Sequence, residues 1–244
     1  MSTPDVVSAV TLPQQLKTES LRGVRAWCDN RARSKQTGVG ASDLGHPCVR
    51  NLAYKATGAA KHPQVTDQWP SAVGISVHGG ALHEAFVNNP DWLLDVRLEI
   101  GPGIRGTLDR YHVPSATVVD DKVLGVEPLK KIRTTGPGDQ YRTQVHCYAF
   151  GLSRLGHDVK NVALCCWPRS GRMVDAYVWA EPYDEDIVER AFVRWYGLVE
   201  AAPAFTPDIF RLLAKADGPC AFCNYYSPGV AATSPDKACE GWKA

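Results

Sequence analysis

The sequence predicts an α/β fold, built as one large domain with a small appendage. The length of 244 residues is ample for a core of its own. A hydrophobic share of 44% beside 22% charged residues is ordinary for a globular chain. Short β-like runs bounded by Gly and Pro alternate with longer segments of helical periodicity. These observations exclude a disordered or fibrous protein.

The first expected elements are helical. Apolar residues recur at helical intervals through about Lys35, which predicts an amphipathic helix. A glycine-rich segment, 37–61, follows with a short helix whose cap would be Ser42 or Asp43. The run 71–88 is typical of a helix in its second half, and Asn89-Pro90 ends it.

A meander of three strands comes next, separated by Gly/Pro turns, and it leads into alternating helices and strands. The periodicity predicts strands over 92–100, 104–112 and 116–122, a helix over 139–155, paired strands over 159–167 and 173–180, and a helix over 184–201. Beyond Pro203 the pattern loosens into a cysteine-containing tail. No internal repeat and no nucleotide-binding P-loop occurs in the sequence.

Charge and apolar runs limit the partners. Lys and Arg number 27 and Asp and Glu 26, a formal net charge of +1, so contact with phosphate must come from a local patch. No run approaches the roughly 20 apolar residues of a spanning helix, and Val6–Leu12 is a poor signal peptide. We therefore expect a cytoplasmic protein without membrane contact, in which clustered cysteines bind metal more often than they form disulfides.

Carboxylates stand at the ends of two neighbouring predicted strands. Asp109 follows Gly106-Thr107-Leu108, and the next strand ends in Asp120-Asp121-Lys122. Because strand side chains alternate faces, Asp120 and Lys122 point the same way and Asp121 points to the other face. We expect only Asp120 and Lys122 to share a site with Asp109, where oxygen ligands suit Mg²⁺ or Mn²⁺ and the lysine faces a phosphate. An isolated D-x-K is more often a surface strand pair.

Residues elsewhere in the sequence favour a catalytic site at this motif. His83 lies in the preceding helix, and Gln144 and Tyr148 are four residues apart on one face of the following helix. Each of the three, taken alone, is a structural residue.

In this order, the sequence resembles the RecB-like exonucleases of the PD-(D/E)XK superfamily, and particularly their CRISPR-associated branch with phage relatives. The resemblance covers about Gly40 to Cys239 and rests on six ordered elements: S-D-L-G-H-P-C-V-R-N-L-A-Y, G-G-A-L-H-E, G-T-L-D, V-V-D-D-K, Q-V-H-C-Y and the C-terminal cysteines. It implies a restriction-endonuclease-like core with a mixed central sheet flanked by helices. A phage-encoded member would act in the host cytoplasm.

The resemblance also implies roles. His83, Asp109 and Asp120 would be metal ligands, the backbone carbonyl of Asp121 would complete the metal shell, Lys122 would be the catalytic lysine, and Gln144 and Tyr148 would position DNA. His78 competes with His83, because Gly74-Ile75-Ser76-Val77-His78 has a similar spacing; the G-x-x-H-E context favours His83. Glu99 is a further, weaker candidate.

The DNA path is expected near the second catalytic strand. Lys130, Lys131 and Arg133 would follow it in a loop, and Arg142 opens the helix that bears Gln144. A solvated basic loop is an equally good interpretation. Trp69 and Tyr141 could stack on bases, although a core position is the more common role for such aromatic residues.

The resemblance implies that four cysteines, Cys48, Cys220, Cys223 and Cys239, bind one iron-sulfur cluster, most often of the 4Fe-4S type. Cys220-x-x-Cys223 is a chelating pair, and Cys239 follows it after a longer gap than is usual in the family. Zinc is the alternative, held by four thiolates or by three with His46. We expect Cys147, Cys165 and Cys166 to be core residues and leave Cys28 unassigned.

These expectations define four segments: an N-terminal helical segment 1–36, an upstream cluster segment 37–70, a nuclease core 71–202 and a C-terminal cysteine module 203–244. The leading function is a metal-dependent exonuclease acting on single-stranded DNA or DNA ends. Recombination or CRISPR-type adaptation proteins would be partners. The alternatives are a structure-specific endonuclease on the same core, and a non-catalytic DNA-binding or scaffold protein with a zinc or iron-sulfur clamp.

Overall fold

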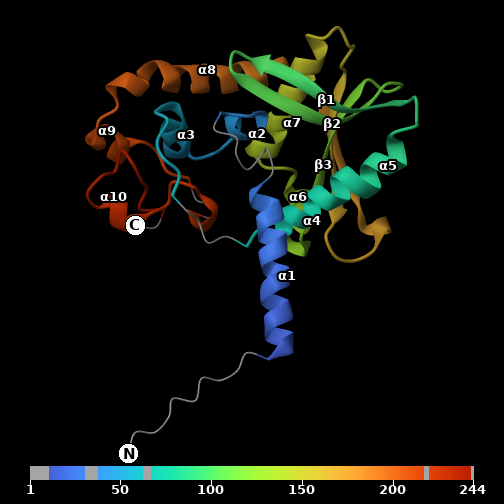
Figure 1. Cartoon of the computed structure of the whole chain (residues 1–244). Coiled ribbons are helices and arrows are strands. Elements are labelled where there is room, and N and C mark those ends of the chain that lie inside the picture. The colour runs from blue at the N-terminus through green and yellow to red at the C-terminus, as the bar shows by residue number, and fades with distance from the viewer. Residues whose placement is uncertain (1–10, 31–37, 63–66, 217–219, 243–244) are drawn as a thin grey trace, which may run out of the picture. The chain divides into compact units, whose positions relative to one another are not determined.

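The computed structural model describes residues 11–30, 38–62, 67–216 and 220–242 of the chain (Figure 1). It divides into two compact units, Met1–Thr37 and Gly38–Ala244. The first contains helix α1 (Leu12–Asp29), which begins with Pro13 in its first turn and a capping box between Thr11 and Gln14. No described helix is both long and apolar enough to cross a membrane.

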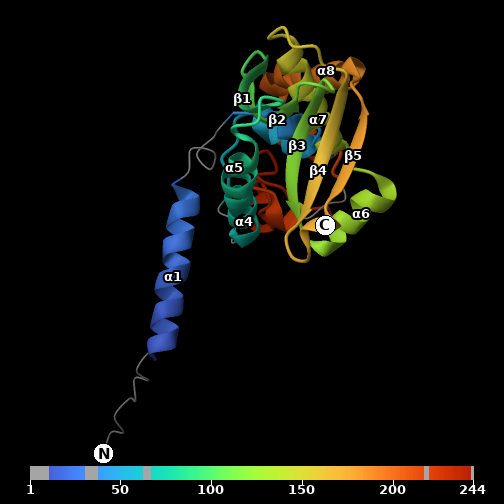
Figure 2. The same cartoon turned by 90° about the vertical axis from the view of Figure 1, so that its right-hand side faces the viewer.

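The second unit is built on a mixed five-stranded sheet in the order β1-β2-β3-β4-β5 (Figure 2). Its strands are β1 (Trp92–Gly101), β2 (Ile104–His112), β3 (Thr117–Leu124), β4 (Asn161–Pro168) and β5 (Tyr177–Pro182). Only the β3–β4 pair is parallel, and the helices between these two strands make the crossover. The α/β class and the mixed sheet predicted from the sequence are confirmed.

Helix α7 (Asp139–Ser153) packs against β1 to β4 and carries a long run of buried residues, Thr143 to Ala149. On it lie α2 (Ala41–Leu44) and α8 (Glu185–Ala201). The main core cluster lies between this layer and the sheet and includes Leu108, Val118, Val145 and Leu164. The face of the sheet toward α7 is therefore its buried face.

A second helical layer begins with α4 (Trp69–Val77), which contacts β3, and continues through a π-helical turn (His78–Leu82) into α5 (His83–Phe86), which contacts β1. The helix thus starts two residues before the expected segment. The remaining short helices are α3 (Val49–Ala56), α9 (Pro207–Leu212) and α10 (Pro228–Ala231), with 3-10 turns at 173–175, 202–204 and 220–222.

Two predictions of local structure were wrong. The segment expected to be a basic loop after β3 is helix α6 (Val126–Thr135), because Leu129 and Ile132 bury one face of it. Pro128 is tolerated there because it lies in the first turn. The strand expected over 173–180 begins later, since a 3-10 turn occupies 173–175.

Candidate active site

The sheet opens between β2 and β3, and the candidate residues gather at the opening. Only three residue pairs join these strands, and Arg110 with Val119 is the last of them. Beyond it β2 stays paired with β1 and β3 stays paired with β4. Asp109 and Asp120 are the first residues past the last pair, so both carboxylates lie where the strands diverge, Asp109 partly exposed and Asp120 buried.

Strands β1 and β2 both change face at this point. Leu108 and Tyr111 on β2 are three residues apart, yet both lie in the main core cluster, which a regular strand does not allow. On β1, Leu93 and Val96 show the same shift, and Asp95 between them has a left-handed φ of 51°. Asp95 lies opposite Asp109 between two regular pairs of the β1–β2 ladder. The paired irregularity turns both aspartates out of the regular alternation.

Asp109 is in a place that resists its negative charge. Burial and the charge of Asp120 raise the pKa of Asp109 to about 7, although His78, the backbone N–H of Asp121 and Lys122 oppose the rise. That N–H donates to Oδ2 of Asp109 at 2.8 Å. Two carboxylates in one space are both ionised most readily beside a cation.

Asp120 and Lys122 share the α7 side of β3, as predicted. Nζ of Lys122 lies 2.6 Å from Oδ2 of Asp120. This ion pair is the single polar contact of the buried Oδ2 of Asp120 among the described residues. A buried carboxylate oxygen with a free lone pair is a fitting ligand for a hard cation.

Gln144 connects the members of this group. Its Oε1 accepts from Nζ of Lys122 at 3.1 Å, and its Nε2 donates to Oδ1 of Asp120 at 3.3 Å and to the Tyr148 hydroxyl at 2.9 Å. The sequence prediction that Gln144 and Tyr148 share a helix face beside the D-x-K motif is therefore correct. Their roles toward a substrate stay predictions.

The charges of the group are fixed by its neighbours. Burial lowers the pKa of Lys122, but Asp120 and Asp109 outweigh burial and the net pKa is raised, so the ammonium stays charged. Burial, with Asp120, raises the pKa of Tyr148 to about 12 and keeps its hydroxyl protonated. The ring of Tyr148 packs against Gly106, where a Cβ would come within 2.6 Å of Cε1. The glycine of G-T-L-D thus makes room for this tyrosine.

Asp121 points to the opposite face, as predicted, but its carboxylate has a structural partner. Arg110 donates to both of its oxygens, at 2.6 and 2.7 Å, and Nε1 of Trp167 donates to Oδ1 at 2.8 Å. The buried guanidinium of Arg110 also lies over the rings of Phe86 and Trp92. The lone pairs of the Asp121 carboxylate are therefore engaged within the protein.

The helix across the opening supplies two histidines. Nε2 of His78 lies 3.5 Å from Oδ1 of Asp109 and 3.5 Å from Oδ1 of Asp95. Nδ1 of His83 lies 2.9 Å from Oδ2 of Asp95. His78 is thus the histidine that contacts Asp109, whereas the G-x-x-H-E context had favoured His83. Asp95 was missed altogether, since no sequence motif marks it.

A hollow of about 180 Å³, open to solvent, joins these groups and is lined by both histidines, Asp95, Asp109 and Asp121 among others. Ligand atoms of His78, Asp109 and Asp121 lie within 4.8 Å of one another, and they are the single such group of three in the described part of the chain. This overturns the expectation that only Asp120 and Lys122 share a site with Asp109. Because the Asp121 carboxylate already binds Arg110, His78 and Asp109 are the better ligands of that group.

The other expected contacts are scattered. Lys130 and Lys131 are exposed on α6, while Nε of Arg142 lies 2.5 Å from Glu181. Tyr141 is half-buried, with its ring 4.9 Å from Nζ of Lys122. Trp69 is 58% exposed at the start of α4, so a core position for it was wrong.

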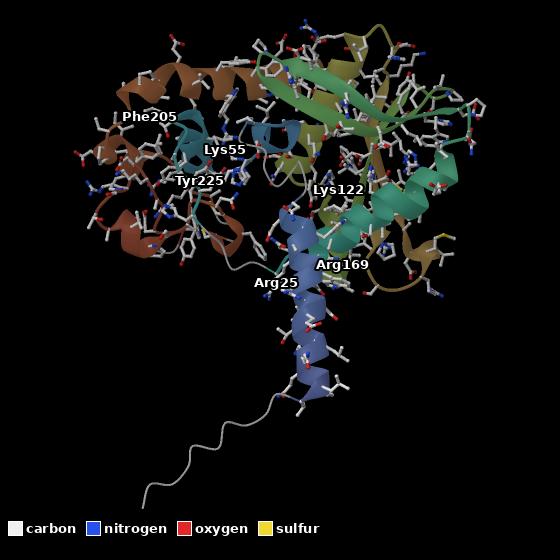
Figure 3. The ribbon with its side chains drawn as sticks, in the orientation of Figure 1. Arg25, Lys55, Lys122, Arg169, Phe205 and Tyr225 are labelled. Carbon is white, nitrogen blue, oxygen red and sulfur yellow. The ribbon has the colours of Figure 1, made fainter. Side chains whose placement is uncertain are left out.

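Glu99 and Arg169 mark the limits of the site. Glu99 on β1 is exposed and pairs with Arg105 on β2, away from Asp109. Arg169, which sequence analysis did not single out, is exposed just after β4, and its N–H donates to the carbonyl of Leu124 (Figure 3). Leu124 lies two positions after Lys122, so Arg169 extends the positive charge of the β3 end.

The cysteine-bearing segments pack together at a second place. Cys48 precedes α3, whose buried Tyr54 stacks on Phe210 and Tyr225 from the tail. Arg50 binds Glu240 through its guanidinium at 2.9 Å. The start of the second unit and its C-terminal segment are therefore held together by a small core and a buried ion pair.

Each of the three tail sulfurs accepts an N–H group. Nδ2 of Asn51 donates to Cys223 at 3.2 Å, the backbone of Trp242 to Cys220 at 3.3 Å and the backbone of Gly241 to Cys239 at 3.4 Å. Gly241 has φ of 98°, and a Cβ there would meet the Tyr226 ring at 2.8 Å. N–H donors aimed at sulfur suit cysteines that act as thiolate ligands.

The remaining thiols in this unit are core residues, as predicted. Burial raises the pKa of Cys147 and Cys166 to about 12 and that of Cys165 to about 11. These thiols stay protonated, which suits packing and disfavours metal binding.

Comparison with known proteins gives a likeness in fold. No family model and no curated protein matches the chain. The alkaline exonuclease LHK-Exo from Laribacter hongkongensis superposes with a TM-score of 0.51 at 11% identity over 74% of this chain and 93% of that chain.

Two further structures are similar. LHK-Exo in complex with dAMP gives a TM-score of 0.50 at 13% identity over 73% of this chain and 93% of that chain. A phage related exonuclease from Haemophilus somnus 129PT gives 0.44 at 12% identity over 64% and 79%. The chain therefore shares its fold with an alkaline exonuclease.

Proposed function

We propose that this protein is a metal-dependent DNA exonuclease that hydrolyses phosphodiester bonds at the opening between β2 and β3. The observation that carries the proposal is the arrangement of Asp109, Asp120 and Lys122: two carboxylates at the point where the strands part, with a charged lysine 2.6 Å from one of them. The shared fold with an alkaline exonuclease supports the same reaction class.

The residues fit a Mg²⁺ or Mn²⁺ ion. Nε2 of His78 and Asp109, which belong to the close group of possible ligands, would hold it. Asp120, which lies outside that group, and the backbone carbonyl of Asp121 would add ligands as the site closes on the ion. Such an ion supplies Lewis-acid stabilisation of the phosphate and an activated water. His83, the ligand expected from the sequence, would not bind the ion itself, because it contacts Asp95 and not Asp109.

Lys122 would face the phosphate that is cleaved. Its raised pKa keeps the ammonium charged, and Gln144 and Asp120 hold Nζ in place, so the charge is preorganised for the extra negative charge of the transition state. Gln144 and Tyr148 would hold this geometry from α7.

DNA would reach the opening along a local basic patch, because the chain has almost no net charge. The exposed Lys130 and Lys131 on α6 and Arg169 after β4 would bind phosphates. Trp69 on α4 would stack on a base of a single strand. The assignment to the CRISPR-associated branch, a phage origin and recombination partners stay predictions.

The test is cleavage of end-labelled linear DNA, single- and double-stranded, with Mg²⁺ or Mn²⁺ against EDTA. Lys122→Met should abolish cleavage, because the charge at the phosphate is lost. It should also lower stability, because the buried Asp120 loses its ion-pair partner, so cleavage is compared at a temperature at which circular dichroism shows the variant to be folded. Lys160→Met is the matched control, since Lys160 is exposed and pairs only weakly with Asp158. Equal activity of both variants would contradict the assignment of Lys122.

We further propose that Cys48, Cys220, Cys223 and Cys239 hold a 4Fe-4S cluster that fastens the tail to α3. The N–H groups directed at three of the sulfurs support a thiolate site. Tetrahedral zinc would place its sulfurs about 3.8 Å apart, given Zn–S bonds of about 2.3 Å. The larger 4Fe-4S cluster holds its four thiolates further apart than that, so metal analysis distinguishes the two.

Anaerobic purification tests the cluster. The protein should be brown, with iron and acid-labile sulfide, and Cys220→Ser should lose iron and stability together. Cys28→Ser, in the first unit, is the control and should keep its iron. Colourless protein with stoichiometric zinc would refute the cluster.

A further inference from the structure

We propose that Asp95 is an additional ligand of the divalent cation at the opening, and that His83 holds Asp95 in place from the outer side. The inference rests on the proposed function and assigns the two residues of the hollow that the proposal above leaves without a direct role. It makes His78 and His83 partners in one site instead of alternatives.

The distances allow Asp95 to reach the cation. Nε2 of His78 is equally far, 3.5 Å, from Oδ1 of Asp95 and from Oδ1 of Asp109. With bonds of about 2.1 Å, two ligand atoms of one octahedral ion are about 3 Å apart when adjacent and about 4 Å apart when opposite. Both separations from His78 fall between these values, so an ion bound to His78 is within reach of either carboxylate. The three residues do not form a group within 4.8 Å, so Asp95 has to turn toward the ion to bind it together with Asp109.

The balance of charge favours a cation near Asp95 and Asp109. Of the four carboxylates around the opening, Asp120 pairs with Lys122 and Asp121 pairs with Arg110. Asp95 and Asp109 have no Lys or Arg ion pair within the described ranges, and both contact histidine instead. Two uncompensated carboxylates match the charge of one divalent ion.

Asp121 cannot take this place with its side chain. Both of its oxygens accept from Arg110, and one also accepts from Trp167. Moving the carboxylate to a metal would leave a buried guanidinium unpaired, which costs several kcal/mol. Asp95 is 46% exposed on its side chain and bound only to imidazoles, so it can turn toward an ion at little cost.

The backbone of both elements is shaped for this contact. Asp95 adopts φ of 51° within a strand, a conformation that aspartate tolerates better than most residues. The π-helical turn brings the N–H of His83 to the carbonyl of His78. At about 4.4 residues per turn, side chains five apart lie on nearly the same face, whereas an α-helix separates them by about 140°.

That turn lets one carboxylate serve both imidazoles. Oδ2 of Asp95 is hydrogen-bonded to Nδ1 of His83 at 2.9 Å, and the other carboxylate oxygen, Oδ1, faces Nε2 of His78. A hydrogen bond to the far oxygen of a metal-binding carboxylate fixes its orientation, as outer-shell partners do in other metal sites.

The experiment is titration of the full-length metal-free protein with Mn²⁺ at neutral pH, followed by calorimetry and by the Mn²⁺ EPR signal. Asp95→Asn removes the charge, keeps the shape and tolerates positive φ. It should raise the Kd for Mn²⁺ at least tenfold, and His83→Gln should raise it by a smaller factor. Asp91→Asn is the matched control, because Asp91 is an exposed aspartate four residues earlier, and its Kd should not change.

An Asp95→Asn protein with the affinity of Asp91→Asn would overturn the inference. If Asp95→Asn does not fold, Asp95→Gly accepts the same φ and replaces it in the titration. The readout is separate from cleavage. If the protein binds Mn²⁺ tightly through Asp95 but cuts no DNA, the proposed function is refuted and this inference stands. If the protein cuts DNA but binds Mn²⁺ equally well without Asp95, this inference is refuted and the proposed function stands.

Discussion

Asp109→Asn should stabilise the metal-free protein at alkaline pH while it abolishes metal binding. The pKa of Asp109 rises from 3.8 to about 7 because the carboxylate is buried beside Asp120. Between these pH values the native state keeps a proton that the unfolded state has lost, so the free energy of unfolding falls as pH rises from about 4 to 7. Above pH 7 the penalty is complete.

The magnitude follows from the shift. About three pKa units correspond to roughly 4 kcal/mol, an upper value for this interacting pair of carboxylates. For a unit of this size that is a melting-temperature difference of about 10 °C. Asparagine lacks the charge, and its Oδ1 can still accept from the N–H of Asp121, so the variant keeps the contact and loses the penalty.

The assay is thermal unfolding of wild type and Asp109→Asn in EDTA at pH 4.5 and pH 8. The two proteins should melt at similar temperatures at the lower pH, and the variant should melt higher at pH 8. Mn²⁺ should then raise the melting temperature of the wild type and leave that of Asp109→Asn unchanged. A variant that is less stable than wild type at pH 8 in EDTA would refute the reasoning.

Three further changes test the surrounding residues. Asp121→Ala should lower the free energy of unfolding by about 3–5 kcal/mol in denaturant melts, because it leaves Arg110 buried without its partner; Asp158→Ala, an exposed control, should cost less than about 1 kcal/mol. Gln144→Ala should slow cleavage about 10- to 100-fold, because it removes the hydrogen bond from the charged Lys122. Tyr148→Phe should slow it about 3- to 10-fold, because it removes a neutral hydrogen bond to Gln144. A loss as complete as in Lys122→Met would place them in the reaction itself. Trp69→Ala should weaken binding of a single-stranded oligonucleotide about tenfold in fluorescence anisotropy and leave duplex binding unchanged; equal effects on both would exclude stacking.

The sheet was predictable because its turns are strongly marked. Gly101-Pro102-Gly103 and Val113-Pro114-Ser115 bound the meander, and β1 to β3 lie within two residues of their predicted ranges. Helix α6 was not predictable in the same way, because a proline and a run of basic residues hide the spacing of its two buried residues. The composition of this segment is typical of a loop, and two buried residues are too few to show a helical period.

The candidate site was predictable on β3 and α7 and not on β1 and α4. Alternation on a regular strand and four-residue spacing on a regular helix correctly brought Asp120, Lys122 and Gln144 together. Asp95 was missed because its place depends on a left-handed residue inside a strand. His83 was preferred to His78 on its G-x-x-H-E context, and a motif does not reveal the π-helical turn between the two histidines.

Comparison of linear and covalently closed circular DNA tests the central claim most directly. Wild-type protein with Mn²⁺ is incubated with the same duplex in both forms, and acid-soluble nucleotide is measured over time against an EDTA control. A metal-dependent exonuclease should release nucleotides from the linear form and leave the circle intact. Nicking of the circle would contradict an exonuclease, and binding of both forms with no nucleotide release would contradict a nuclease altogether.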